Sequence, residues 1–526
     1  MKLCIKNLPE IYGTESVSLP EEQILRLPEK VLQFGTGVFL RGFIDYIFDK
    51  ANKEGVFNGR AVVVKSTTTG DVDDFVRQDN LYTLIMRSMD EGITIEDKVV
   101  CAAISRVILA EQNWKEVLEC AANKELRIII SNTTETGIEL LAGDLISNDP
   151  PISFPAKLLG FLYQRFLIFD GDPSSGMVII PTELIRDNGT KLKAILNTLA
   201  LQNNLDDQFI VWLNKYNDFC NSLVDRIVPG KPPSAEHHKL QKELGYTDDL
   251  MVMSETFGLW AIETKNDRSR CALSFSNAYA GVHLVENIEK FRELKLRLLN
   301  GSHNLSCAVG FLAGFRTVKE AMADPFFNNF MQKLILVEIS NAIVSENISL
   351  LEAQEFGAKV LERYHNPYIE FDWLNICVED TAKLRIRALQ IILQHAQKYN
   401  YVPPCICLGF AAYILFMRSK KGEDGFYWGI NAGQPYLITD NVAMRLADYW
   451  EKFEEGEKQE TGARLVGNKC GSNESGQINE LVRDILSDRD LWQEDLSMVN
   501  GFMEEVGRLL SLLLERGVAA TLRLQG

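Results

Sequence analysis

The sequence lacks the marks of secreted and membrane-spanning proteins. Its ten cysteines show no paired spacing, no CxxC occurs and the two nearest are Cys405 and Cys407, so we expect reduced thiols. The longest apolar run, Cys405 to Met417, has about 13 residues, whereas a membrane-spanning helix needs about 20. The opening MKLCIKNLPE contains no apolar signal-peptide core. These absences predict a cytoplasmic protein without a membrane partner.

Basic residues are also scarce relative to acidic ones. The chain has 55 lysines and arginines against 72 aspartates and glutamates, a formal charge of −17. Such a surface repels a phosphate backbone, so we expect no nucleic-acid partner. A small anionic substrate would need a local basic pocket. His237 and His238 lack cysteine or acidic neighbours at zinc-ligand spacing, so we expect surface histidines and no metal.

The 526 residues, 46% apolar and 24% charged, predict a folded protein of two to four domains. The first half alternates short apolar runs with helical patterns, and the runs suit strands that are buried on both faces of a parallel sheet. This alternation predicts a doubly wound, Rossmann-like α/β domain. The predicted strands are Val31–Phe34, Ala61–Val64, Arg127–Ile130 and Met177–Ile180, and the helices are Phe39–Lys53, Trp114–Asn123, Phe154–Phe166 and Lys191–Ala200.

The second half has the apolar spacing of three and four that is typical of helices. We therefore predict a dinucleotide-binding domain at 1–285 and a mostly α-helical substrate and catalytic domain at 286–526. Residues 455–477, rich in glycine, glutamate, lysine and asparagine, are expected to form a loop or insertion. The predicted helices are 287–315, 326–343, 350–363, 374–399 and 442–453.

A glycine-rich turn follows the first predicted strand. Glycines at Gly35 and Gly37 allow a tight turn and a close approach of the backbone to a pyrophosphate at the start of the next helix. The third glycine is displaced to Gly42, so the usual GxGxxG spacing is broken. The second strand ends at Lys65 with no acid at its tip, and Asp71 lies further on, which leaves NAD and NADP both open.

A polar cluster follows the domain boundary. At about 100° per residue, Asn300 lies about 140° and His303 about 80° around a helix from Lys295, so the three share one broad face. An ammonium, an amide and an imidazole together suit proton transfer to a carbonyl oxygen. A solvated lysine and a core histidine are the alternative interpretation of the same spacing.

These motifs together resemble a known family. The segment QFGTGVFLR at 33–41, SNTTE at 131–135, Asn188-Gly189, the segment 221–227 and the pattern KxxxxNxxH at 295–303 are similar to the polyol-specific long-chain dehydrogenases, or mannitol dehydrogenase family. Leu40 stands where mannitol and fructuronate enzymes more often have histidine, and Asn375 where mannitol-type enzymes have arginine. The first departure favours the tagaturonate branch. The second argues against a simple hexitol substrate and fits a uronate-branch pocket, and it leaves the partner of the substrate carboxylate unassigned.

The resemblance implies an NAD-dependent, metal-independent oxidoreductase that reversibly reduces tagaturonate to altronate in hexuronate catabolism. It implies Lys295 as general acid/base, Asn300 and Asn188 as amides that hold the substrate oxygen, and His303 as the group that orients the substrate. Asp225 and Lys383 would line the substrate pocket, with Arg387 as a second candidate for its carboxylate. The implied cofactor-binding residues are Gln33, Phe34, Gly35, Thr36, Gly37, Val38, Phe39, Leu40, Arg41, Gly42, Asn132 and Thr133.

Two other hypotheses stay open at this point. A fructuronate reductase or a mannitol-type dehydrogenase would use the same chemistry with a different stereochemical fit. A non-catalytic nucleotide-sensing protein would keep the fold without turnover, although the intact Lys295, Asn300 and His303 argue against it.

Overall fold

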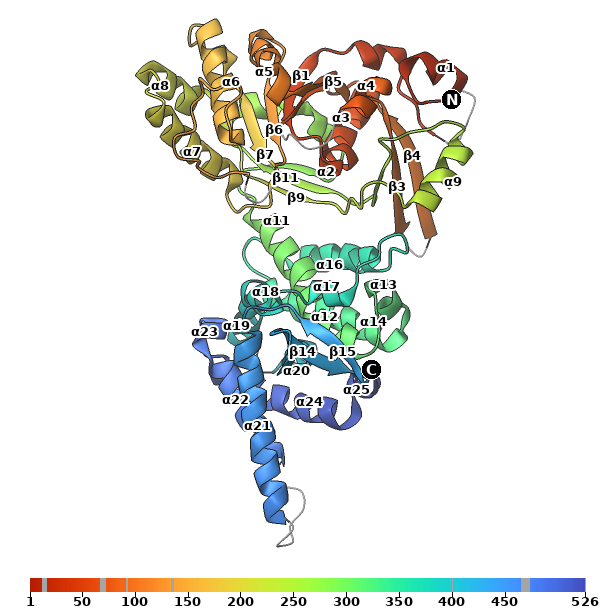
Figure 1. The fold of residues 1–526 in the computed structure, drawn as a ribbon, viewed down its shortest axis with the longest axis vertical. Coiled ribbons are helices and arrows are strands. Elements are labelled where there is room, and N and C mark those ends of the chain that lie inside the picture. The colour runs from red at the N-terminus through yellow and green to blue at the C-terminus, as the bar shows by residue number, and fades with distance from the viewer. Residues whose placement is uncertain are drawn as a thin grey trace. The chain divides into compact units, whose positions relative to one another are not determined.

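A computed structural model describes residues 1–11, 17–66, 72–90, 93–133, 137–399, 401–464 and 474–525. Asp71, Thr134 and Glu135 lie outside the described residues. The chain divides into two compact units, the first made of residues 1–88 and 93–291 and the second of 89–92 and 292–526. Figure 1 labels the elements of both units.

A six-stranded parallel sheet forms the centre of the first unit (Figure 1). Its strand order is the Rossmann order, in which the chain reverses direction across the sheet between the first and fourth strands. The four strands predicted from the sequence are all present, at β1, β2, β6 and β7. In spatial order the strands are β5 Ile104–Leu109, β2 Arg60–Lys65, β1 Glu29–Phe34, β6 Ile128–Ser131, β7 Val178–Pro181 and β8 Asp218–Phe219.

Helices cover both faces of this sheet, which explains the continuous apolar runs of its strands. Within β1, Val31 packs into a core with Ile44 and Phe48, whereas Leu32 points to the opposite core with Leu158. One face is covered by α2 Val38–Gly42 and α3 Ile44–Lys53, and the other by α5 Ala110–Glu119, α6 Phe154–Ile168, α7 Asn188–Gln202 and α8 Asp207–Tyr216.

The helix predicted at Phe39–Lys53 is broken after its first turn. Phe43 has φ −135° and ψ −72°, which separates α2 from α3. Further strands and helices complete the unit: β3 Tyr82–Asp90, β4 Ile93–Cys101, β9 Ser222–Asp225, β10 Val252–Ser254, β11 Leu259–Glu263, β12 Val282–Val285, α1 Leu8–Ile11, α4 Asp73–Arg77, α9 Ser234–Leu244 and α10 Asp267–Ala272.

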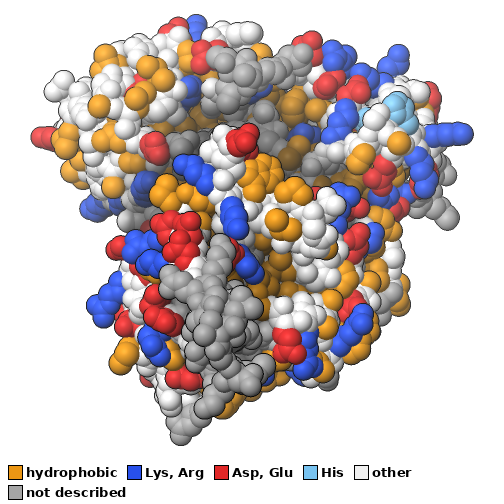
Figure 2. Space-filling model, turned by 60° about the horizontal axis from the view of Figure 1, so that its bottom comes forward, with side chains coloured by type: hydrophobic (Ala, Val, Ile, Leu, Met, Phe, Trp, Pro, Cys, Tyr) orange, Lys and Arg blue, Asp and Glu red, His pale blue; other side chains and the backbone are white. Residues whose placement is uncertain are grey.

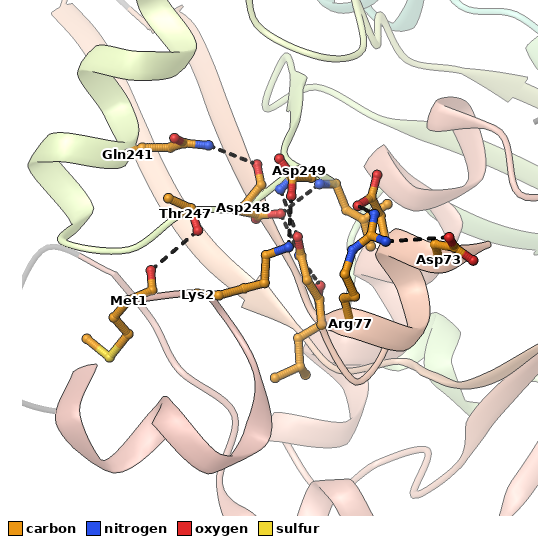
Figure 3. Close-up of polar contacts among 12 residues, drawn as sticks. Met1, Lys2, Asp73, Arg77, Gln241, Thr247, Asp248 and Asp249 are labelled. Atoms are coloured by element: carbon orange, nitrogen blue, oxygen red, sulfur yellow. Dashed lines mark hydrogen bonds and ion pairs between the residues drawn. The ribbon is translucent and has the colours of Figure 1, made fainter. Parts of the chain in front are cut away.

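The N-terminal residues are held by the loop between α9 and β10. Figure 3 shows Lys2 directed at Asp249, with 3.1 Å between the charged atoms, and Thr247 directed at the Met1 carbonyl. The same loop corrects one prediction, because His237 is buried and its Nε2 lies 2.7 Å from the Asp248 carbonyl oxygen. Its neighbour His238 is exposed, as expected for a surface histidine.

The second unit is mostly helical around one large apolar core. Its helices are α12 Ser302–Leu312, α13 Val318–Ala323, α14 Pro325–Gln332, α15 Ser340–Ile343, α16 Leu350–Tyr364, α17 Trp373–Ile376, α18 Asp380–Arg387, α19 Leu389–Lys398, α20 Pro404–Phe416, α21 Ala443–Arg464, α22 Glu474–Ser487, α23 Arg489–Trp492, α24 Phe502–Arg516 and α25 Val518–Gln525. Helix α11, Glu289–Leu294, leads into it from the first unit.

Two features of this unit differ from the sequence-based expectation. An antiparallel sheet of β13 Lys420–Lys421, β14 Tyr427–Asn431 and β15 Gln434–Ile438 interrupts the helices, and its strands are only two to five residues long. The loop expected at 455–477 is wrong at both ends, because α21 continues to Arg464 and α22 begins at Glu474. Residues 465–473 between them lie outside the described residues.

Among the residues that the structure describes, no helix has the length and apolar character to cross a bilayer. On the face drawn in Figure 2, lysine and arginine side chains are interspersed with aspartate and glutamate side chains. That face therefore presents no broad field of one sign.

Candidate active site

In the glycine turn after β1, the backbone of Gly35 lies close to the backbone of Asn132. Gly35 has φ +126°, a conformation that side chains rarely adopt, and a Cβ there would lie 2.9 Å from the Asn132 carbonyl oxygen. The Gln33 side chain donates to the Gly35 carbonyl at 3.3 Å and to the Asp45 carboxyl at 3.3 Å. Burial raises the pKa of Asp45 to about 7. Backbone and side-chain contacts thus fix this turn.

A cleft of about 530 Å³ opens beside the turn, where β1 and β6 end. It lies at the point where the strand order reverses, which is where open α/β sheets bind their ligands. Gly37 lines it, and a Cβ on Gly37 would meet no atom within 4 Å. The cleft is lined by Gly35, Thr36, Gly37, Lys65, Ser66, Asn132, Thr133, Gly137, Glu139, Leu140, Leu141, Ile152, Ser153, Phe154 and Lys157.

Five of the predicted cofactor residues line this cleft: Gly35, Thr36, Gly37, Asn132 and Thr133. Val38 is exposed and Phe39 half-buried, outside the lining. The rest of the predicted set is buried away from solvent, namely Gln33, Phe34, Leu40, Arg41 and Gly42. Arg41 donates to the Leu250 carbonyl, and a Cβ on Gly42 would lie 2.6 Å from Val228. None of these five buried residues is among those that line the cleft.

A buried carboxylate that the sequence reasoning missed holds the loop after β6. Glu183 Oε1 accepts hydrogen bonds from the Thr133 backbone N–H and hydroxyl, both at 2.9 Å, and Oε2 accepts from the Ser131 hydroxyl at 3.1 Å. Burial raises the pKa of the Glu183 carboxyl. The sequence could have indicated this residue by its position two residues after the end of β7, at the same edge of the sheet as Ser131 and Thr133.

Asn188 and Asp225 lie in the first unit, and both are buried. The Asn188 amide nitrogen donates to the carbonyls of Pro181, Glu183 and Ser222, and its oxygen accepts from the N–H groups of Gly189 and Ser222. Asn188 has no exposed surface, and each polar atom of its side chain is bonded to a backbone group. Its role as an amide that holds the substrate oxygen stays a prediction.

Lys295 and Asn300 lie in the second unit on a π-helical segment, Lys295–Gly301. A π-helix closes its hydrogen bonds from residue i to i+5, so residues five apart lie about one turn from each other. Lys295 and Asn300 have this spacing, and both are half-buried. The angle of about 140° expected from an α-helix therefore does not apply to this segment, because the wider turn places residues five apart closer together around the helix axis.

His303 follows in the first turn of α12 and is held by aromatic rings. Its imidazole stacks on Tyr364 with 4.4 Å between ring centroids, and Phe371 approaches it edge-on at 6.3 Å. The Tyr364 hydroxyl donates to the Leu299 carbonyl at 3.0 Å. The stack fixes the plane of the imidazole beside the π-helical segment.

Side chains of α18 form hydrogen bonds with α12, the helix that carries His303. Asn304 donates to the buried Asp380 carboxyl at 2.6 Å and accepts from the Arg387 guanidinium at 2.6 Å. Burial raises the pKa of Asp380 to about 7. Lys383, half-buried on the same helix, donates to the Ile376 carbonyl at 3.1 Å.

Among the described residues, no cluster of histidine, cysteine, aspartate and glutamate side chains is arranged to hold a metal ion. The chemistry present is an amine, an amide and an imidazole in one unit and a cleft beside the glycine turn in the other.

Comparison with known proteins identifies the family of both units. Residues 29–274 match the model of the mannitol dehydrogenase Rossmann domain, and residues 287–513 match the mannitol dehydrogenase C-terminal domain. The chain belongs to the mannitol dehydrogenase family. Its membership confirms the resemblance found in the sequence, and the Rossmann sheet with a helical second unit confirms the predicted fold class.

Relatives of this mannitol dehydrogenase family member are similar over nearly their whole length. The altronate oxidoreductase of Halalkalibacterium halodurans is 35% identical over 94% of this chain and 92% of its own. The altronate oxidoreductase of Shigella flexneri is 34% identical over 94% and 96%. The solved mannitol 2-dehydrogenase of Pseudomonas fluorescens, a ternary complex with NAD and D-mannitol, shares the fold at 22% identity with a TM-score of 0.65, covering 100% of this chain and 99% of its own.

Proposed function

We propose that this protein is a tagaturonate reductase, which interconverts tagaturonate and altronate with a nicotinamide dinucleotide. The observation that carries the proposal is the π-helical segment, which holds Lys295 and Asn300 about one turn apart in a chain whose relatives at 34 to 35% identity are altronate oxidoreductases. The first unit binds the dinucleotide and the second presents the proton donor.

The cleft of the first unit fits a dinucleotide. Its glycine backbone leaves room at Gly37 for a pyrophosphate, and the following helix begins without a side-chain cap, so its first N–H groups are available. A bound nicotinamide dinucleotide supplies the hydride in the reductive direction. The proposed binding residues are Gly35, Thr36, Gly37, Asn132 and Thr133, with NAD as the preferred cofactor because the family resemblance favours it.

Lys295 and Asn300 act on the substrate oxygen. In reduction the Lys295 ammonium protonates the oxygen that becomes the new hydroxyl, and in oxidation the neutral amine removes that proton. The Asn300 amide donates to the same oxygen and stabilises its partial charge. His303, fixed by its stack on Tyr364, orients a neighbouring substrate hydroxyl. Asn188 is proposed as a second amide for the substrate oxygen, and Asp225 and Lys383 are proposed to line the substrate pocket.

A substrate panel tests the proposal. Tagaturonate, fructuronate and fructose are each mixed with NADH and with NADPH, and the absorbance at 340 nm is followed. The proposal expects the highest kcat/KM for tagaturonate with NADH. A preference for fructuronate or fructose would move the protein to another branch, and no oxidation with any substrate would favour the nucleotide-sensing alternative.

Substitution of the proton donor tests the mechanism separately. We expect Lys295→Ala to lower kcat by about 10²- to 10⁴-fold, the usual loss when a general acid/base is removed. Lys290→Ala, on the helix that leads into the π-helical segment, is the matched control and should keep the wild-type rate. Near-normal turnover by Lys295→Ala would defeat the assignment.

A further inference from the structure

The guanidinium of Arg387 is a cation without a carboxylate partner among the residues that the structure describes. Its polar contact is one neutral hydrogen bond, from Nη1 to the Asn304 amide oxygen at 2.6 Å. By contrast Arg297, a buried arginine on the same π-helical segment as Lys295, is neutralised by Glu293 at 3.0 Å. The Asp380 carboxyl is close enough to raise the pKa of Arg387 but forms no direct ion pair with it, and a half-buried guanidinium of this kind can bind an anion.

The remaining donors of Arg387 are accessible. None of its nitrogens is among the buried polar atoms that lack a partner in the described part of the chain, so those not bonded to Asn304 contact solvent. Burial of the side chain lowers the pKa of Arg387, because the charged guanidinium is partly removed from water. An arginine fork that retains open donors fits the two oxygens of a carboxylate.

The position of Arg387 connects it to the proposed reaction site. Asn300 and Asn304 are four residues apart, and residues with this spacing lie on the same side of a helix. The Arg387 carbonyl oxygen is 3.4 Å from the place of a Cβ on Gly301, which follows Asn300 directly. The Asn304 amide that accepts from the guanidinium is therefore about one turn along the helix from Asn300.

Asn304 and Asp380 hold the guanidinium in place. Asp380 Oδ1 accepts from the Asn304 Nδ2 at 2.6 Å, so the amide is oriented with its oxygen toward Arg387. All atoms of this relay belong to one unit, and both Asn304 and Asp380 are buried. The fork is thereby pre-positioned, which reduces the entropy lost when an anion binds.

We propose that Arg387, positioned by Asn304 and Asp380, binds the carboxylate of the hexuronate and selects it over a neutral ketohexose. This inference rests on the proposed function and adds the residue that recognises the acid. Lys383, one turn earlier on α18, is the rival candidate, and its ammonium is directed at the backbone carbonyl of Ile376 instead.

The test compares kcat/KM for tagaturonate and for the neutral ketohexose fructose in matched variants. For Arg387→Met we expect a loss of about 10- to 100-fold with tagaturonate, mostly in KM, and less than threefold with fructose, because a hydrogen bond to a charged group is removed only for the acid. Arg385→Met, on the same helix with its guanidinium at the Leu491 carbonyl, is the control and should change neither value.

The outcomes separate the inference from the proposed function. If the wild type reduces no hexuronate, the proposed function fails and the inference fails with it. If the wild type reduces tagaturonate but Arg387→Met loses both substrates equally, or Lys383→Met alone shows the selective loss, only the inference is overturned. Should Arg387→Met not fold, Arg387→Lys is compared in the same way, by the loss of kcat/KM for tagaturonate relative to that for fructose. Lysine keeps the positive charge but lacks the paired donors of the guanidinium.

Discussion

Replacement of Gly37 by alanine separates the contribution of this residue to stability from its proposed role in binding the dinucleotide. Gly37 has φ −60° and ψ 153°, which alanine adopts without strain, and the added methyl would meet no protein atom within 4 Å. Alanine at such a position reduces the freedom of the unfolded chain and stabilises by about 0.4–1 kcal/mol. The folded protein should therefore melt at the wild-type temperature or slightly above it.

Dinucleotide binding should respond in the opposite direction. The open space at Gly37 faces the cleft, and we propose that the pyrophosphate approaches the backbone there. A methyl group in that space should raise the Kd for NADH at least tenfold, a cost of about 1.4 kcal/mol or more. Fluorescence titration of NADH gives the Kd, and thermal unfolding of the same samples gives the stability.

Gly35→Ala is the matched comparison. Its φ of +126° and the carbonyl oxygen 2.9 Å from its Cβ predict a destabilisation of about 1–3 kcal/mol before any ligand is added. Wild-type affinity for NADH in a stable Gly37→Ala protein would refute the pyrophosphate assignment. Destabilisation of Gly37→Ala to the level of Gly35→Ala would refute the geometric reasoning.

Two further predictions concern buried carboxyl groups. Glu183→Gln should lower stability by about 1–2 kcal/mol and weaken NADH binding severalfold, because an amide cannot accept all the hydrogen bonds from Ser131 and Thr133; unchanged binding in titration would show that this loop does not contact the dinucleotide. Burial raises the pKa of Glu338, which caps α20, from its ordinary 4.5 to about 7. As the pH rises, the Glu338 carboxyl therefore stays protonated in the folded protein after it has lost its proton in the unfolded chain. Its contribution to the free energy of unfolding is complete below pH 4.5 and falls by about 3 kcal/mol or less as the pH rises to 7. Glu338→Gln should flatten that part of a stability profile measured at pH 4 to 8, and an identical profile would contradict the assignment.

The sequence by itself determined the elements whose signal is local. Continuous apolar runs such as Val31–Phe34 predict strands covered on both sides, and the structure packs alternate residues of β1 into two different cores. The glycine turn after that strand was also predictable, because the conformation of a tight turn depends on the residues within it. Motifs of this kind also carried the resemblance to the mannitol dehydrogenase family.

Tertiary structure decided which side chains meet. The spacing of Lys295 and Asn300 was visible in the sequence, but the π-helical backbone that carries both residues was not predicted from it. Asn188 was singled out by its motif, whereas the hydrogen bond from its amide to the Ser222 carbonyl, 34 positions away, is visible only in the folded chain.

The contact between Arg387 and Asn304 joins residues 83 positions apart. Local spacing fixes which residues lie on one helix face, whereas a hydrogen bond over such a separation exists only after helices have packed. The glycine turn and the lysine motif were therefore open to prediction from the sequence. The orientation of the guanidinium, and with it the proposed recognition of the acid, became visible only in the folded chain.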